Sequence, residues 1–156
     1  MKLITFAFLI LTFLLTENAL IADSPPKFWI KNFEGKRFNS KKQNTPFVVS
    51  FFFVNCMPCI KEIPLLYKFM SEDYPNVPLL FIDPIKQDSK KKIKKFAKKL
   101  KVPLSYFYKD SFGSISKKFF KKKIAFPTIV GIKEGKYIFK YKGIDDKTII
   151  EIKSLL

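Results

Sequence analysis

Histidine is absent from this 156-residue sequence, and cysteine occurs only twice, at Cys56 and Cys59. The lack of histidine excludes Ser-His and Cys-His catalytic pairs and any metal site built on imidazole. Two thiolates supply only half of a tetrahedral zinc site, so we expect neither a metal nor a cofactor other than a redox-active disulfide. The cysteines also make a poor structural staple, because a disulfide stabilises a fold mainly by closing a longer loop.

Acidic residues are scarce: 13 Asp and Glu stand against 30 Lys and Arg, which leaves a net charge of +17. Lysines crowd two segments, residues 90–101 and 117–123. One hypothesis is contact with a membrane surface or an acidic partner through these Lys-rich helices. The other, which we favour, is a solvated helix face. Nucleic-acid binding is not expected, because no recognisable reading motif accompanies the charge.

Apolar residues make up 47% of the chain, enough for one packed domain of this length. The order at its start is Lys2, an apolar run over 3–15, then the small residues Ala19 and Ala22, which is typical of an export signal. We expect residues 1–22 to be a cleaved signal peptide and residues 23–156 to form the domain, in the periplasm or elsewhere outside the cytoplasm. The alternative is an uncleaved inner-membrane anchor, although the apolar run of about 13 residues is shorter than the roughly 20 that span a bilayer.

Hydrophobic periodicity predicts an α/β fold, with a central mixed β-sheet flanked by helices and an N-terminal β-hairpin extension. The segment 103–108 reads as a short strand or an extended loop, and residues 111–122 as a helix that turns Phe112 inward. We expect the other strands at 28–33, 36–39, 47–54, 77–82, 128–132 and 137–141, and the other helices after Cys59, at 89–101 and at 145–156.

Cys56-Met57-Pro58-Cys59 follows a strand that is apolar throughout and opens a helix. A helix N-terminus offers unpaired N–H groups and the positive end of the helix dipole, which stabilise a thiolate. We therefore expect Cys56 to lie just outside the first turn, to reach solvent and to have a thiol pKa below about 8.5. Cys59, one turn further, is expected to face inward. Cys56 would then form a mixed disulfide with a substrate, and Cys59 would resolve it.

Phe126-Pro127-Thr128 precedes a predicted strand. Taken alone, Pro127 is an ordinary trans proline at the start of a strand. With the cysteine pair upstream, we favour a cis peptide bond, which is rare and usually functional.

Taken together, these motifs resemble the TlpA/ResA-like branch of the thioredoxin superfamily over about 25–156. The match includes Pro64 and Gly143 besides the cysteine pair and the Phe126-Pro127 motif. The resemblance implies a thioredoxin-like fold in which the Pro127 loop lies beside the cysteines. Residues Met57, Pro58, Phe126 and Pro127 would then contact an extended substrate strand.

Glu62 matches a glutamate that follows the second cysteine in this branch. The resemblance makes it a candidate general acid/base for the thiol of Cys59. The alternative, which we favour on the sequence, is a solvated glutamate that balances Lys61.

Three departures from the family pattern matter. Asn55 stands where tryptophan is usual before the first cysteine, and Ser50 stands where cytoplasmic thioredoxins bury an aspartate. Met57-Pro58 lacks the histidine that stabilises the thiolate of strongly oxidising relatives, which favours reduction over oxidation.

The expected function is that of an extracytoplasmic thiol-disulfide oxidoreductase, most simply a reductase of envelope proteins such as apocytochrome c during cytochrome c maturation. Its partners would be cysteine-containing envelope proteins and a membrane thiol-electron donor. The alternatives are a disulfide oxidase or isomerase and a non-catalytic binding module with the same fold.

Overall fold

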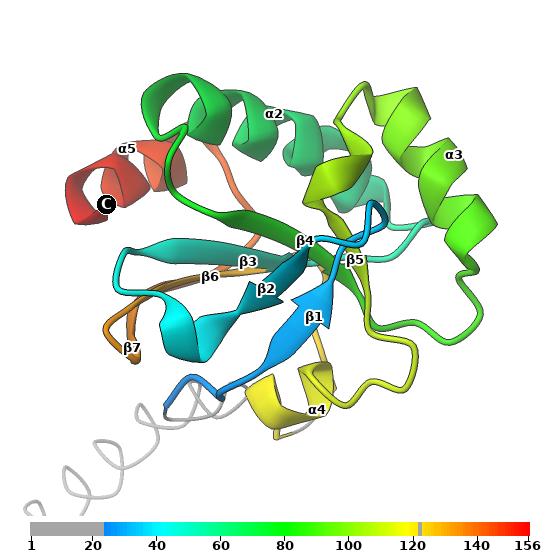
Figure 1. Ribbon diagram of the computed structural model, residues 1–156. Helices are drawn as coiled ribbons and strands as arrows, with labels where there is room; N and C mark the ends of the chain where they lie inside the picture. Colours follow the sequence, from blue (N-terminus) through cyan, green and yellow to red (C-terminus); the bar gives the residue numbers. More distant parts are fainter. Residues whose placement is uncertain (1–23, 122) are drawn as a thin grey trace, which may run out of the picture.

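The computed structural model describes residues 24–121 and 123–156 (Figure 1). The predicted signal peptide, residues 1–22, lies outside the described residues. Within the described ranges, no helix is both long and apolar enough to cross a bilayer.

The described elements alternate strands and helices and then end with a hairpin and a helix, as the periodicity predicts (Figure 1). In chain order they are β1 (Trp29–Lys31), β2 (Arg37–Asn39), η2 (Ser40–Lys42), β3 (Phe47–Phe51), α2 (Met57–Asp73), β4 (Leu79–Asp83), α3 (Lys90–Leu100), η3 (Leu104–Tyr106), β5 (Phe107–Lys109), α4 (Ser116–Phe119), β6 (Thr128–Lys133), β7 (Lys136–Lys142) and α5 (Asp146–Leu155).

Five strands form one mixed sheet in the order β5-β4-β3-β6-β7. Strands β3, β4 and β5 run parallel, so their carboxyl ends meet at one edge of the sheet. Strand β6 runs antiparallel to β3, with Phe51 opposite Thr128, and β7 pairs antiparallel with β6. This register brings the start of β6 to the edge at which β3 ends.

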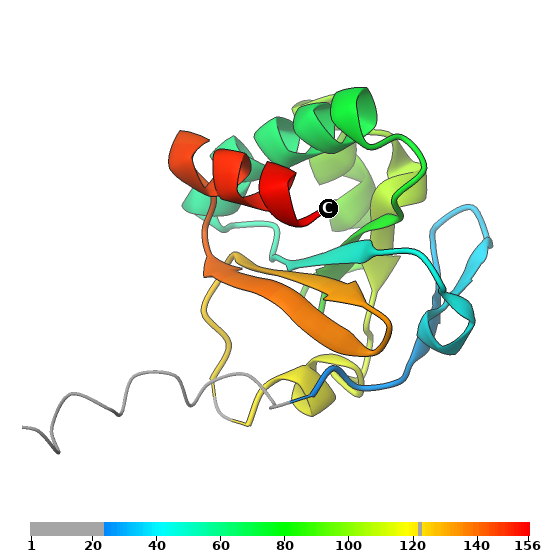
Figure 2. The same ribbon diagram turned by 90° about the vertical axis from the view of Figure 1, so that its left-hand side faces the viewer.

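All five residues of β3 and of β4 are buried, because helices or the hairpin cover both faces of the sheet. Helices α2, α3 and α5 cover one face, and the β1–β2 hairpin with α4 covers the other (Figure 2). Alternate residues of β3 accordingly belong to two core clusters, with Val48 on the helix side and Val49 on the hairpin side. The predicted mixed sheet with flanking helices and an N-terminal hairpin is confirmed.

Aromatic contacts attach the hairpin to the domain. The ring of Phe28 lies 5.6 Å from that of Phe119 in α4, and the ring of Phe38 lies 5.1 Å from that of Phe47 in β3. The side chain of Asn32 donates to the carbonyl of Ser105 at 2.8 Å. The hairpin is therefore part of the core.

The helix predicted over 111–122 is wrong in extent, since α4 covers only Ser116–Phe119. Gly113 adopts a left-handed φ of +64°, and Asp110 Oδ2 accepts hydrogen bonds from the N–H groups of Ile115 and Ser116. These contacts hold 110–115 as a turn. The expectation that Phe112 faces inward is also wrong, because its side chain is 88% exposed.

Candidate functional site

Cys56 lies at the start of α2, directly after the loop that follows β3. Its backbone is extended (φ −78°, ψ 105°), and its Sγ accepts a hydrogen bond from the N–H of Cys59 at 3.2 Å. Cys56 is thus the N-cap, one residue outside the first turn, as predicted. Pro58 occupies the first turn, where its missing N–H leaves no helical hydrogen bond unmade.

A disulfide joins Cys56 and Cys59, whose Cα atoms are 5.2 Å apart. Cys59 faces inward, as expected, and is fully buried. The expectation that Cys56 reaches solvent is wrong for this oxidised state, because the residue is only 2% exposed. Bonding to Cys59 places both side chains in the core cluster on the helix side of the sheet.

The residues flanking the disulfide are at the surface. Asn55, Met57 and Pro58 are all exposed, with Met57 at 66%. A partner that approaches Cys56 therefore meets these side chains first.

Hydrogen bonds from backbone N–H groups tie the loop before Cys56 to β4 and to the segment that follows β4. The N–H of Phe52 donates to the carbonyl of Ile82 at 3.1 Å, and that of Val54 to Asp88 Oδ2 at 3.0 Å. The role of Asp88, which is 5% exposed, was missed at the sequence level. The sequence could have indicated this role by position, because Asp88 follows β4, whose carboxyl end lies beside that of β3.

The predicted cis peptide bond between Phe126 and Pro127 is confirmed. Because Thr128 pairs with Phe51, this loop lies beside the loop that leads to Cys56. The rings of Phe126 and Phe53 are 5.2 Å apart. Phe126 precedes β6, so its backbone lies outside the sheet ladder. The structure thus brings the Pro127 loop and the cysteine turn to the same edge of the sheet.

The solvated role favoured for Glu62 is wrong. Its side chain is half-buried, and Oε2 accepts a hydrogen bond of 2.7 Å from the N–H of Ile144. Burial raises the pKa of Glu62 above its usual value, the bond from Ile144 opposes that rise, and repulsion by Asp145 adds to it.

Gly143 fits closely against this carboxylate. It has a φ of +90°, and a Cβ there would lie 3.3 Å from Oε1 of Glu62. Its N–H donates to the carbonyl of Pro127 at 3.0 Å. Gly143 therefore links the Pro127 loop to Ile144, the residue whose N–H binds the Glu62 carboxylate.

No protein-family model matches the chain, and no curated protein matches it. Several solved structures superpose on most of its length. A candidate protein disulfide isomerase from Bacteroides thetaiotaomicron gives a TM-score of 0.73 at 23% identity, covering 89% of this chain and 91% of its own. StoA from Bacillus subtilis gives 0.68 at 22%, covering 86% and 98%. A secreted Mycobacterium tuberculosis disulfide oxidoreductase homologous to E. coli DsbE gives 0.68 at 18%, covering 82% and 96%.

The chain has a thioredoxin-like fold. In it, the Cys56–Cys59 pair stands at the start of the helix that follows the central strand β3. Among the described residues, no group of three or more Cys, Asp or Glu side chains could hold a metal ion.

A buried carboxyl group does lie in the sheet, but it is on β4 and not at Ser50 of β3, the position at which cytoplasmic thioredoxins bury an aspartate. Ser50 on β3 is buried and carries no acid. Asp83 at the end of β4 is fully buried, and its Oδ1 lies 3.0 Å from Lys109 Nζ. Burial raises the pKa of Asp83 to about 7, although the ammonium group of Lys109 opposes the rise. The sequence reasoning missed this pair.

Proposed function

We propose that this protein is an extracytoplasmic thiol-disulfide oxidoreductase that works as a reductase of disulfides in envelope proteins. The observation that carries the proposal is the Cys56–Cys59 disulfide at the N-terminus of α2, with the Phe126-Pro127 cis peptide in the adjacent loop. The Cys56–Cys59 disulfide is the only redox group that this reaction requires. The lack of histidine in the chain is therefore no obstacle to it.

In the reduced protein, the thiolate of Cys56 attacks one sulfur of a substrate disulfide. A Cys56–substrate disulfide forms, and the other substrate sulfur leaves as a thiolate. The thiolate of Cys59 then attacks Cys56 Sγ, forms the Cys56–Cys59 disulfide and releases the second substrate thiolate. Two electrons pass to the substrate, and its two thiolates take up the protons that the protein's thiols released.

The helix N-terminus supports the first step. In the oxidised state, the N–H of Cys59 already points at Cys56 Sγ, at 3.2 Å. The same donor and the positive end of α2 would stabilise a thiolate at that sulfur. Met57 and Pro58 present an exposed surface next to it, and Phe126 offers backbone outside the sheet to an extended substrate strand.

The residues between the cysteines support the reducing direction. Met57 and Pro58 cannot donate a hydrogen bond to the thiolate as a histidine would, so the reduced state lacks the stabilisation found in strong oxidants. We propose oxidised envelope proteins, apocytochrome c among them, as substrates. A membrane thiol-electron carrier would then return two electrons to the Cys56–Cys59 disulfide.

The decisive experiment is expression of the Cys59→Ser variant in its own cell envelope. Cys56 should accumulate in a mixed disulfide with its substrate, which mass spectrometry identifies and a reductant releases. The Cys56→Ser/Cys59→Ser variant is the matched control and should trap nothing. A Cys59→Ser variant that traps no partner and retains full function would contradict the two-step mechanism.

Two further measurements separate the alternatives. Loss of insulin reduction in Cys56→Ser argues against a non-catalytic binding module. A reduction potential near the thioredoxin value of about −270 mV supports a reductase, whereas one near about −120 mV identifies an oxidase.

A further inference from the structure

An open groove of about 760 Å³ lies between the N-terminal hairpin, the first turns of α3 and the loop that joins β5 to α4. The redox chemistry does not use it. The aromatic side chains Trp29 and Phe112 line the groove, together with several lysines. These lysines are Lys27, Lys31, Lys90, Lys94, Lys109 and Lys118.

The charge of this lining is uncompensated at the surface. Lys109 is paired with the buried Asp83, but the other five lysines are exposed. Asp110 is the one acidic residue that the described chain contributes to the lining, and it is 4% exposed. Its Oδ2 accepts hydrogen bonds from Ile115 and Ser116. The groove therefore presents positive charge to any molecule that approaches it.

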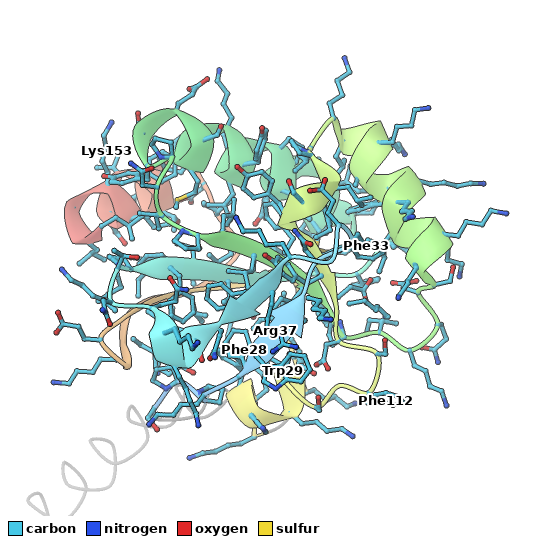
Figure 3. The ribbon with its side chains drawn as sticks, viewed as in Figure 1. Phe28, Trp29, Phe33, Arg37, Phe112 and Lys153 are labelled. Carbon is cyan, nitrogen blue, oxygen red and sulfur yellow. A yellow bond between two sulfur atoms is a disulfide. The ribbon has the colours of Figure 1, made fainter. Side chains whose placement is uncertain are left out.

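Two large aromatic side chains project among these lysines. Trp29 is 60% exposed and Phe112 is 88% exposed, and they come from segments far apart in the sequence (Figure 3). The guanidinium group of Arg37 lies 4.8 Å from the centre of the Trp29 ring and holds that ring at the surface. Exposed rings beside lysines are typical of side chains that enter the headgroup region of a bilayer.

The described part of the chain begins on the side of the molecule that carries the groove. The described residues begin at Ser24 and reach the groove at Lys27, beside β1 and α4 (Figure 1). The predicted export segment directly precedes this point. Helix α3 extends the positive surface away from the groove, since only Ile93, Phe96 and Ala97 of its residues are buried.

We propose that this aromatic-lysine face, formed by Trp29, Phe112 and the five exposed lysines, binds the surface of an anionic lipid bilayer. The two rings enter the headgroup region, and the ammonium groups contact lipid phosphates. An acidic protein segment would pair with the lysines but would leave both exposed rings unexplained. The proposal is independent of the thiol chemistry.

Trp29 is the only tryptophan of the chain, so its fluorescence reports on this face directly. The chain from Ser24 to Leu156 contains every described element and both core clusters, and it keeps the apolar N-terminal segment out of the measurement. Vesicles containing phosphatidylglycerol should shift the Trp29 emission to shorter wavelength, and vesicles of phosphatidylcholine alone should not. An absent shift, or an equal shift with both lipids, would overturn the proposal.

Two charge-matched variants locate the contact. The groove variant is Lys90→Gln/Lys94→Gln/Lys118→Gln, and the control is Lys136→Gln/Lys142→Gln/Lys147→Gln, whose lysines are also exposed and lie on β7 and α5. Each lysine near an anionic surface contributes about fivefold in affinity, so the groove variant should bind phosphatidylglycerol vesicles roughly 100-fold more weakly. The control variant should lose much less of its affinity for these vesicles. Equal losses would mean diffuse attraction and would contradict the assigned face.

Phe112→Ser tests the apolar part of the contact. It should weaken vesicle binding without changing the thermal melting temperature, because the ring is exposed. Polyglutamate provides the remaining comparison: binding that depends on the three groove lysines, with no response to vesicles, would assign the face to acidic proteins and overturn the membrane proposal.

Discussion

Glu62 joins the cysteine helix to the segment after β7. It lies one turn beyond Cys59, and burial raises its pKa, so it keeps a proton to higher pH than an exposed glutamate does. Glu62→Gln preserves an acceptor for Ile144 but cannot exchange a proton. We expect it to lower the rate of insulin reduction about tenfold or more and to remove one ionisation from the pH profile of that rate.

Glu72→Gln is the matched control for this prediction, because Glu72 is exposed on the same helix. Its pH profile should follow that of the unmodified protein. A Glu62→Gln variant with the normal rate and pH profile would show that Glu62 only supports the structure around Ile144.

A comparison of Gly143 with Gly35 separates the energy of backbone strain from the energy of a close side-chain contact. Both have a left-handed backbone, with φ of +90° and +84°, but only at Gly143 would a Cβ approach the carboxylate of Glu62. Each Gly→Ala change should reduce the free energy of unfolding by about 1–2 kcal/mol through backbone strain. Gly143→Ala should cost more than Gly35→Ala in urea unfolding, because the Glu62 carboxylate must also shift. Equal losses would mean that this contact carries no energy.

Local sequence predicts the chemistry of the site better than its accessibility. Helix start, N-cap position and the inward direction of Cys59 depend on neighbours in the chain, and they were predicted correctly. The burial of Cys56 depends on the disulfide and the surrounding core, and the environment of Glu62 depends on Ile144, which is 82 residues away. Contacts of this kind leave no periodic signal in the sequence.

Among the elements, the loop between β3 and α2 depends on one side chain from the segment before α3. Asp88→Ala would leave the N–H of Val54 without its acceptor, which costs about 1–3 kcal/mol when the group is buried. Asp88→Asn keeps a side-chain oxygen and should retain most of the free energy of unfolding. Urea unfolding measures both losses.

The rate of insulin reduction provides a second readout for Asp88. It should fall in the alanine variant, because the turn that carries Cys56 loses its support. Equal stability and equal rates in the alanine and asparagine variants would contradict a role for this hydrogen bond in placing the turn.

Long, strongly patterned elements were predictable, whereas short irregular ones were not. The buried strands β3, β4 and β6 and the amphipathic helix α3 follow directly from apolar runs and helical spacing. The segment 111–122 has helical spacing too, but the Asp110 carboxylate and the left-handed Gly113 hold its first part as a turn. Hydrogen bonding to a single side chain thus overrides the periodicity and exposes Phe112.

The stability of the molecule should depend on the ionisation of Asp83. Its carboxyl group has a pKa of about 7 in the fold against an ordinary value of 3.8, so between these values the folded state binds more protons than the unfolded state. The free energy of unfolding should therefore fall as pH rises from about 4 to about 7, by up to about 1.4 kcal/mol per pH unit from this group.

Asp83→Asn removes this ionisation, so its unfolding free energy should vary less steeply over the same range in urea titrations. Asp73→Asn is the control, because Asp73 forms a surface ion pair with Lys153 at 2.9 Å. Parallel pH profiles for the unmodified protein and Asp83→Asn would contradict the prediction.

The covering of the Cys56–Cys59 bond also limits which molecules the protein can react with. A small thiol that collides at random with the surface meets Asn55, Met57 or Pro58 rather than sulfur. A partner that binds long enough to move this turn gains access to Cys56. We therefore expect small thiols to reduce the Cys56–Cys59 disulfide more slowly than a protein that stays bound at this turn does.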